Sequence, residues 1–387
     1  MAKKMLFLFV LLLSLTGMLK AQVTTAGMSG KVMADEESVI GATVVAVHEP
    51  SGTSYGTVTN VDGRFSLQGM RSGGPYKVTV SYIGYQTAIY TGIQLQLGET
   101  YSLNVTLHEA SELLGEITIT ASKSKFSAEK TGATTNISSE QLTTLPSINR
   151  SISDFTRISP YASGNSFGGR DGRSNTFTVD GANLNNNFGL SSGLPGGGNP
   201  ISLDAIDEVQ VVIAPYDVRQ ANFIGAGINA ITKSGTNAYR GSAYMYFNNE
   251  VMRGNKIGDT DFGARAEESK TVYGATFGGP IIKDKLFFFA NVEYEKSPQQ
   301  VITWRAAKEG ETPNNSTISR TTEADLAEFS QILKGKYGYN TGSFTDFPAD
   351  VTNLKLLGRI DWNINQGNKL SVRYNFTNNK TWESTQW

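Results

Sequence analysis

The stretch PISLDAIDEVQVVIAPYDVRQANFIGAGINAITKSGTN, residues 200–237, decides how the rest of this chain is organised. It contains two short runs of β-forming residues, Val209–Ala214 and Gly227–Thr232. The loop between them carries Pro215, Asp217, Arg219 and Gly225. Gly- and Asn-rich sequence precedes the stretch, and long alternating segments rich in aromatic residues follow it. We therefore expect a compact polar module to end here and a sheet of another kind to begin.

The composition limits the classes of protein that the chain can belong to. Its 387 residues suggest roughly two to three domains, and no stretch reaches the ~18–20 apolar residues of a membrane-spanning helix. The absence of cysteine excludes disulfides, thiol catalysis and cysteine-ligated metals. The 34 basic and 35 acidic residues balance, so we expect no nucleic-acid partner.

Residues 1–21 have the pattern of a secretory signal peptide. Lys3 and Lys4 supply the positive region, Met5–Leu13 is an unbroken apolar run, and Ala21 is a small residue at the end of the segment. An apolar run of this length is too short for a spanning helix. We expect export of the chain, and the alternative is an apolar N-terminus that is not cleaved.

From residue 22 to 110 the sequence predicts a small all-β domain. Short strands separated by turn signals are predicted at Gly41–Val47, Tyr55–Thr59, Arg64–Leu67, Pro75–Tyr82 and Tyr101–Leu107. Asn60-Val61-Asp62-Gly63 predicts a hairpin turn between two of them. About seven such strands indicate a β-sandwich.

Both histidines of the chain, His48 and His108, lie in this domain near predicted strand ends. A catalytic histidine needs a nucleophile or a carboxylate that converges on it, and the sequence offers no such set. We interpret both as ordinary surface or edge residues. We expect no catalytic residue, no metal site and no cofactor, and therefore no enzyme.

Residues 111–124 form a linker around one strand-like run, Glu116-Ile117-Thr118-Ile119-Thr120-Ala121. An extended segment between domains can add a strand to the sheet of a partner protein through backbone hydrogen bonds. The alternative is the first strand of the following domain. On the residues alone, the alternative is favoured.

Residues 125–236 combine short helices with short strands, which predicts an α+β module. Ser139–Leu145, which Pro146 stops, and Ile148–Arg157 are the candidate helices. The run from Thr176 to Gly181, TFTVDG, predicts a strand that ends in a tight Asp-Gly turn with positive φ.

Gly225-x-Gly227-x-x-Ala230 fits the dinucleotide-binding fingerprint. That fingerprint needs a helix that opens on the glycines. A β-type run, Ile228–Lys233, follows them here. We therefore reject nucleotide binding.

After residue 236 long segments alternate between apolar and polar residues. Candidate strands are Tyr239–Phe247, Thr271–Phe277, Leu286–Glu295, Leu354–Ile364 and Leu370–Phe376, with turns at Gly279-Pro280, Asp284-Lys285 and Asn365–Asn368 and a long polar segment at Ser297–Thr352. Runs of ~9–11 residues with one apolar face, short turns and long loops are typical of an outer-membrane barrel. A soluble antiparallel sandwich with one buried face is the alternative, which the signal peptide and the loop asymmetry disfavour.

Five candidate strands are too few for a closed membrane barrel. The smallest need ~8 strands, because an open sheet edge cannot face lipid. We therefore interpret the chain as an N-terminal fragment of a larger protein with an incomplete transmembrane β-barrel.

The order of these motifs resembles the TonB-dependent outer-membrane receptors. GATV…TVTNVDGRFSL…YKVTVSYIGYQT, within residues 41–87, resembles the carboxypeptidase regulatory-like domain at the front of many exported receptors of Bacteroidetes. That domain is a non-catalytic sandwich of a carbohydrate-binding-like fold class. In receptors that carry it, the segment that corresponds to Glu116–Ala121 is, or adjoins, the TonB box, the peptide that TonB captures in the periplasm.

Residues 176–181, 206–211 and 225–233 resemble the "VDG", "I-x-x-I-E-V" and "G-G-x-I-N-I-x-T-K" motifs of the plug domain in this family. The matching positions are Asp180, Gly181, Glu208, Val209, Gly225, Gly227, Asn229, Thr232 and Lys233. Ala214-Pro215-Tyr216 departs from the common Arg-Gly-Pro, and the match is closest to the Oar-like subgroup, whose ligands are poorly defined. The departure weakens any transfer of a siderophore or vitamin substrate to this chain.

The resemblance implies a mainly β protein: an N-terminal sandwich in the periplasm, an α+β plug, and the first strands of a barrel that has about 22 strands in this family. It implies energised uptake of an unidentified extracellular ligand across the outer membrane. TonB, with its inner-membrane complex, and outer-membrane lipid are the implied partners. The alternative is a non-transporting envelope or adhesion protein whose sandwich binds carbohydrate or a protein partner.

Overall fold

The fold is that of a computed structural model. It describes residues 23–34, 37–109, 117–120, 133–147, 150–185, 199–215, 217, 220–221, 223–261, 269–298, 305–314, 318–344 and 350–381. The expected signal peptide lies outside the described residues, as do Glu116, Ala121 and Arg219. The protein is mainly β, as its sequence predicts.

Two five-stranded sheets form an N-terminal sandwich. One sheet contains β1 (Ala26–Ala34), β2 (Glu37–Ser38), β5 (Arg64–Met70), β8 (Thr100–Ser102) and β9 (Val105–Leu107). The other has the order β10-β7-β6-β3-β4 and contains β3 (Thr43–His48), β4 (Thr53–Val58), β6 (Gly73–Ser81), β7 (Ala88–Leu95) and β10 (Ile117–Thr120).

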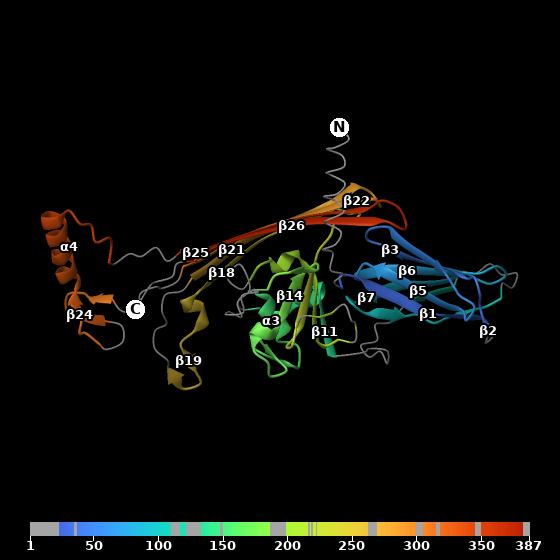
Figure 1. Ribbon diagram of the computed structural model, residues 1–387, viewed down its shortest axis with the longest axis horizontal. Helices are drawn as coiled ribbons and strands as arrows, with labels where there is room; N and C mark the ends of the chain where they lie inside the picture. The colour runs from blue at the N-terminus through green and yellow to red at the C-terminus, as the bar shows by residue number, and fades with distance from the viewer. Residues whose placement is uncertain are drawn as a thin grey trace, which may run out of the picture. The chain divides into compact units, whose positions relative to one another are not determined.

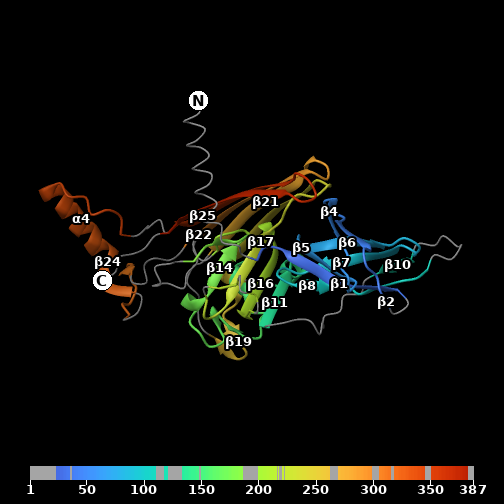
Figure 2. The same ribbon diagram turned by 45° about the vertical axis from the view of Figure 1, so that its right-hand side comes forward.

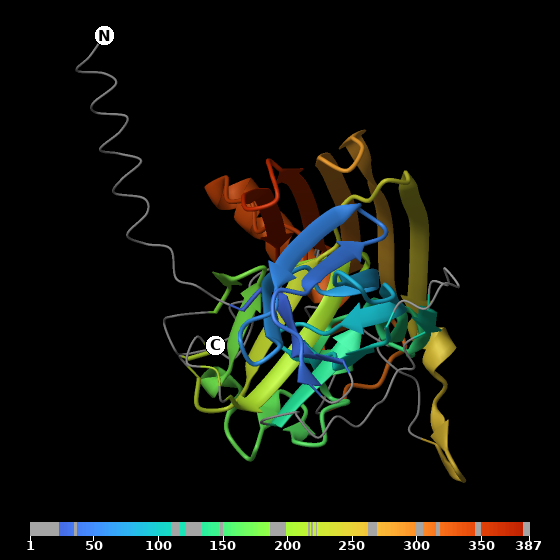
Figure 3. The ribbon, with the colours of Figure 1, turned by 90° about the vertical axis from the view of Figure 1, so that its right-hand side faces the viewer.

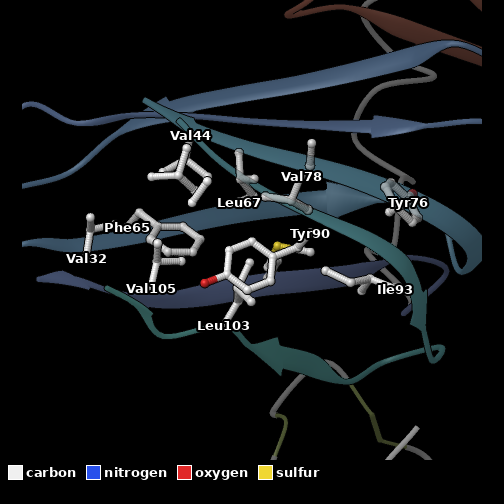
Figure 4. Close-up of a cluster of buried hydrophobic side chains, with 14 of the residues drawn as sticks. Val32, Val44, Phe65, Leu67, Tyr76, Val78, Tyr90, Ile93, Leu103 and Val105 are labelled. Carbon is white, nitrogen blue, oxygen red and sulfur yellow. The ribbon is translucent and has the colours of Figure 1, made fainter. Parts of the chain in front are cut away.

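The core of the sandwich follows from alternation along its strands. In β6, Tyr76, Val78 and Val80 are buried while Lys77 is exposed. Figure 4 shows Val78 beside Leu67, which comes from β5 of the other sheet. Full burial of each such aliphatic side chain contributes about 1.5–3 kcal/mol, so this core holds the two sheets together.

Two details of the sandwich differ from the expectations. Residues 60–63 do form a turn, with Gly63 at φ 72°, but it joins β4 of one sheet to β5 of the other and closes no hairpin. His48 is buried, not at the surface, and its Nδ1 lies 2.7 Å from Ser51 Oγ. Burial, with a smaller effect of Arg71, lowers the pKa of His48 to about 3, so this ring is neutral at physiological pH.

The central sheet contains β11 (Ala133–Ser138), β14 (Thr176–Val179), β15 (Ala182–Asn183), β16 (Ile206–Ala214) and β17 (Gly227–Thr232), in the order β11-β16-β17-β14-β15. Figure 2 shows β14, β16 and β11 close together in this sheet. Strands β14 and β17 are parallel, and the other neighbours are antiparallel. The glycines of the fingerprint therefore lead into a strand, as the sequence predicts.

Short helices and turns complete this module. They are α2 (Ser139–Thr144), α3 (Ile152–Thr156), η1 (Gly172–Ser174), η2 (Leu203–Ala205) and the small ladder of β12 (Ala162–Ser163) with β13 (Ser166–Phe167). The expected helix Ile148–Arg157 is too long at its N-terminal end. Arg150 has φ 52°, and Ser151 caps α3 in a box with Asp154. A residue in the left-handed region followed by an N-cap does not belong to a helix.

The wall sheet contains β18 (Arg240–Asn249), β21 (Ser269–Ile282), β22 (Leu286–Pro298), β25 (Asp350–Asn363) and β26 (Lys369–Lys380), hydrogen-bonded in this order. Figure 1 shows β21, β25 and β26 as long strands that run together. In Figure 3 the dark red strand is β26, one of the two edges. Among the described residues β18 and β26 stay unpaired with each other, so this sheet does not close.

Further elements lie between the wall strands. They are η3 (Glu250–Arg253), β19 (Lys256–Ile257), β20 (Thr260–Asp261), β23 (Arg305–Ala307), β24 (Ile318–Thr322) and α4 (Glu323–Tyr337). The polar segment Ser297–Thr352 thus carries a helix that the sequence analysis missed. Helix α4 begins at a capping box of Thr322 with Asp325 and ends at Gly338, at φ 64°. In the part of the chain that the structure describes, no helix is long and apolar enough to cross a membrane.

The expected turn at Gly279-Pro280 is wrong, because both residues lie inside β21. The chain turns at residues 283–285, where Asp284 has φ 61°, so the turn expected at Asp284-Lys285 is confirmed. A Cβ on Gly279 would lie 2.2 Å from the ring of Tyr239, whose hydroxyl donates to Pro280 O at 2.9 Å. The glycine therefore permits close packing and does not make a turn.

Strands β22 and β25 bury charged side chains beside Phe287, Phe289 and Leu357, and they expose several apolar side chains on the other face. In β22, Glu293 is 2% exposed while Val292 is 43% exposed. In β25, Lys355 is 1% and Asp361 2% exposed while Ile360 is 47% exposed. Lys355 Nζ lies 2.8 Å from Glu293 Oε1. The alternation predicted for both strands is confirmed, and buried charges opposite exposed apolar residues are what is expected of a barrel wall.

Candidate functional site: a buried ion cluster around Asp180

The Asp-Gly turn predicted from the sequence links β14 to β15. Asp180 has φ 49° and Gly181 φ 85°, and Val179 pairs with Ala182 across the turn. Two successive positive φ values are the requirement of this tight turn, and Asp and Gly are residues that tolerate it. The turn directs the Asp180 side chain to a fixed place at the end of β14.

The carboxylate of Asp180 binds the end of the neighbouring strand. Because β14 and β17 are parallel, Asp180 lies close to Thr232, the last residue of β17. Thr232 N donates to Oδ1 at 2.9 Å, and Thr232 Oγ1 donates to Oδ2 at 2.6 Å. The Asp180 side chain is only 2% exposed. Two plug-motif positions that are far apart in the sequence therefore meet here.

Two arginines of the wall sheet complete the shell of Asp180. Arg373 Nη1, from β26, lies 2.6 Å from Asp180 Oδ1. Arg359 Nη1, from β25, lies 3.7 Å from the same oxygen and donates to Thr232 O at 2.6 Å. These residues belong to one compact unit of the chain, which contains residues 1–241, 276–291 and 357–375. The contact thus joins the central sheet to the wall sheet through charge.

The ion cluster continues to Asp361. Arg359 donates to both its carboxylate oxygens, Nε to Oδ2 at 2.8 Å and Nη2 to Oδ1 at 3.0 Å. Ser371 Oγ also donates to Oδ1, at 2.5 Å. Arg71 of the sandwich lies 3.7 Å from Asp361 and donates to Ser234 Oγ at 2.8 Å. We call Arg71, Asp180, Thr232, Arg359, Asp361 and Arg373 the Asp180 cluster.

The groups of this cluster are arranged to hold two sheets together by ion pairs and hydrogen bonds. A carboxylate that already accepts from an amide, a hydroxyl and guanidinium groups has little capacity left to act as a base or to bind a metal. Among the described residues there is no group of three or more His, Asp or Glu side chains that could hold a metal ion. The cluster fixes one sheet to another without covalent chemistry.

A second polar contact joins the sandwich to the central sheet. Leu97, in the turn after β7, donates its N–H to Glu208 Oε1 at 3.0 Å and Oε2 at 3.1 Å. Its carbonyl accepts from the side chains of Gln210 and Asn136. Burial raises the pKa of Glu208 to about 8, although the Leu97 hydrogen bond opposes this shift. We call these four residues the Leu97 seam.

The other predicted motif residues lie in or beside β16 and β17, and among the described residues no hydrogen bond or ion pair joins their side chains to Asp180. Val209 is fully buried in the core of the module. Asn229 accepts from Thr178 Oγ1 at 2.5 Å, and Lys233 N donates to Ala205 O at 2.8 Å. A Cβ at Gly227 would lie 2.7 Å from the Phe223 ring. A Cβ at Gly225 would lie 2.3 Å from Asn175 Oδ1.

Sequence reasoning missed the partners of Asp180. Arg359 and Arg373 lie in the candidate strands Leu354–Ile364 and Leu370–Phe376, and the alternation there assigns them only to a polar face. Alternation shows that such residues point to one side of a sheet, and it does not show what they meet there. Charged residues on the inner face of a barrel strand are the one available signal.

Within the strand-like run Glu116–Ala121, residues Ile117–Thr120 form β10. β10 pairs with β7 of the sandwich in parallel. The alternative interpretation, a first strand of the following domain, is therefore wrong. Glu116 and Ala121 lie outside the described residues.

Two family models match the chain. The model of the carboxypeptidase regulatory-like domain matches residues 27–108, and that of the outer membrane beta barrel domain matches residues 231–306. The first match covers strands of the sandwich and the second covers the start of the wall sheet. Together they relate the chain to outer-membrane barrel proteins with a regulatory-like domain in front of the barrel.

The sequence relative is more specific. The chain is 25% identical over 344 residues to the TonB-dependent transporter Oar of Myxococcus xanthus. The aligned region covers 84% of this chain and 30% of the relative. These matches relate the chain to the TonB-dependent outer-membrane receptors, as its motifs predict.

Solved structures of similar fold include the siderophore receptor PirA from Acinetobacter baumannii, with a TM-score of 0.40, 20% identity, and coverage of 63% of this chain and 31% of that one. Another is the ferric enterobactin receptor PfeA from Pseudomonas aeruginosa, with a TM-score of 0.42, 15% identity, and coverage of 65% and 34%. The chain spans about a third of the length of these relatives.

Proposed function

We propose that this chain is part of a receptor that carries an unidentified extracellular ligand across the outer membrane with energy delivered through TonB. The contact of Asp180 with Arg359 and Arg373 carries the proposal. In this proposal the central sheet is the plug, and the wall sheet is the start of the barrel. Residues Glu116–Ala121 are the segment that TonB captures in the periplasm, on the same side as the sandwich.

A plug has to be held firmly at rest and still be able to move. Ion pairs meet both requirements because their strength depends on the exclusion of water. Buried charges interact strongly, and the same charges in water contribute about 0–1 kcal/mol per pair. A contact made by Asp180 and two arginines therefore holds the plug while it is dry and releases it once water enters.

The other parts have separate roles in the proposal. The apolar outer face of the wall sheet, with Val292 and Ile360, contacts outer-membrane lipid. The segment between β22 and β25, which carries α4, extends from the ends of two wall strands and contributes to ligand binding. No covalent chemistry is required, in keeping with relatives that are transporters and receptors.

The test is a deletion of Glu116–Ala121 in the membrane-embedded protein. The probe is the purified periplasmic domain of TonB from the same organism. We expect the deletion to weaken binding of this domain by more than about tenfold, because the backbone groups of the captured strand are lost. A six-residue deletion of the exposed turn Glu309–Asn314 is the matched control, and it leaves binding unchanged.

Equal binding of the TonB domain before and after the deletion of Glu116–Ala121 overturns the proposal. Binding of carbohydrate or of another cell surface by the same deletion variant then favours the adhesion protein. The two outcomes separate an energised receptor from a passive envelope protein.

A further inference from the structure

The TonB-capture segment of the proposed function is an ordered edge strand of the sandwich. Ile117, Thr118, Ile119 and Thr120 pair in register with Ala88, Ile89, Tyr90 and Thr91 of β7. In the sheet order β10-β7-β6-β3-β4, β10 is one of the two outer strands. The segment is therefore held along one side by the sandwich.

A strand has two sides that can form hydrogen bonds. Successive residues direct their backbone N–H and C=O groups to alternate sides, so pairing with one neighbour leaves every second residue available to another. β7 takes the inner side of β10, and no strand of the described residues takes the outer side. An exposed strand edge of this kind is a template for an incoming strand.

The platform under β10 is itself fixed. Strand β7 runs directly into Leu97, whose N–H and carbonyl bind Glu208, Gln210 and Asn136 of the central sheet. β7 also pairs along its other side with β6. The position of β10 is thus determined by the sandwich and by the Leu97 seam, and not only by the linkers on either side of it.

We infer that the sandwich presents Ile117–Thr120 to TonB as a preformed strand, and that an extended strand of the TonB periplasmic domain adds to the open side of β10 while β10 stays on β7. This inference rests on the proposed function. The gain is preorganisation: an isolated linker has to lose its conformational freedom on binding, whereas β10 has lost it already. The binding surface for TonB is then the segment together with the sandwich, and not a free peptide.

A disulfide tests this inference directly, because the chain has no cysteine of its own. Thr120 and Thr91 are register partners, and Thr91 is not part of the buried core. Neighbouring strands lie about 4.7–4.9 Å apart, within the Cα separation that a disulfide accepts. The double variant Thr91→Cys with Thr120→Cys therefore locks β10 onto β7 when oxidised and releases it when reduced. Each single variant is a control for the substitutions themselves.

The measurement is the affinity of the TonB periplasmic domain for the membrane-embedded protein in its oxidised and reduced forms. We expect the oxidised double variant to bind within about twofold of the unmodified protein. Binding that is about tenfold weaker or worse when oxidised, and that returns on reduction, shows that TonB strips the segment from the sandwich and overturns the inference. Formation of the disulfide, followed by mass, reports that the variant is folded with the two strands paired.

A peptide provides a second measurement that does not depend on any folded variant. A synthetic peptide of residues 112–124 is expected to bind the TonB domain about tenfold more weakly than the intact protein, because it is not preorganised. Equal affinity of peptide and protein also overturns the inference, while the proposed function stands. If neither the protein nor the peptide binds the TonB domain, the proposed function fails and the inference fails with it.

Discussion

Apolar and charged residues alternate along the strands of both the sandwich and the wall sheet, but opposite faces are buried in the two. In β6 of the sandwich, Val78 is buried and Lys77 is exposed. In β25 of the wall sheet Lys355 is buried and Ile360 is exposed. Both strands alternate with a period of two. The charged face of β6 is exposed, whereas the charged face of β25 is buried.

The difference teaches that the pattern along a strand does not say which face is the inside. The surrounding solvent decides it. Water around the sandwich solvates its charged face, so the apolar face packs into a core. Lipid around a barrel wall accepts the apolar face, so charged groups turn inward and have to find partners there. In the Asp180 cluster, Arg359 and Arg373 have such partners in Asp180 and Asp361.

The largest loss of stability is expected from removal of the Asp180 carboxylate. Asp180→Ala removes the carboxylate that Arg373 and Thr232 bind, while Arg359 keeps its two hydrogen bonds to Asp361. Loss of one partner of a buried ion pair costs about 3–5 kcal/mol. We expect hydrogen exchange of the Thr232 amide, which donates to Asp180, to accelerate by a corresponding factor.

Asp180→Asn is the matched control for this prediction. Asn keeps an acceptor for the Thr232 amide and tolerates the positive φ of 49° at this position. It removes the charge that the arginines bind. If the Thr232 amide exchanges as fast in the Asn variant as in the Ala variant, the stability comes from the ion pairs. If this amide exchanges as slowly in the Ala variant as in the unmodified protein, the cluster is not a source of stability.

A smaller effect is expected on the outer faces. Val292→Arg places a charge on the apolar side of β22, and arginine in the middle of a bilayer costs about 2–4 kcal/mol. Ile83→Arg in the sandwich changes a side chain that is 94% exposed, and the expected change is within about 0.5 kcal/mol. Urea unfolding of the protein in lipid vesicles measures both. Equal effects at the two positions show that the face with Val292 does not contact lipid.

The smallest effect is a pH dependence at the Leu97 seam. The pKa of Glu208 is raised from 4.5 to about 8 in the folded protein, so the folded state binds this proton more tightly than the unfolded chain. The related stability is fully present below pH 4.5 and is lost as pH rises through about 8. Glu208→Gln is expected to remove this slope and to stabilise the protein at pH 9 relative to the unmodified protein.

Thermal unfolding between pH 5 and pH 9, about the range over which Glu208 titrates, checks this prediction. Glu49→Gln, at an exposed position of the sandwich, is the control and keeps the slope of the unmodified protein. A Glu208→Gln variant with an unaltered slope shows that another group titrates in this range.

Local patterns in the sequence predict much of this fold. Alternation predicts the faces of β22 and β25, and the Asp-Gly pair predicts the turn at Asp180, because each depends on residues close together in the chain. The hairpin expected at residues 60–63 is wrong because the same turn chemistry serves a crossing between two sheets. A turn residue specifies backbone angles and not the partner of the strand that follows.

Only the central-sheet residues of the Asp180 site were predictable from the sequence. The motif positions Asp180 and Thr232 follow from the resemblance, while Arg359 and Arg373 depend on contacts between segments that are remote in the sequence. The pairing of β10 with β7 is of the same kind. Four residues of β-forming sequence fit many sheet edges, and only the folded chain selects one.

The Asp180 cluster also determines what has to happen when the central sheet moves. The side chains of Asp180, Arg359 and Asp361 are 2%, 12% and 3% exposed, so they are nearly dry at rest. The ion pairs of Asp180 with Arg359 and Arg373, and the hydrogen bond from Arg359 to Thr232 O, have to be replaced by contacts with water when the two sheets part. Separation of the central sheet from the wall sheet and entry of water between them therefore occur together. An osmolyte too large to enter the barrel, which withdraws water, would oppose this event in proportion to the number of water molecules taken up.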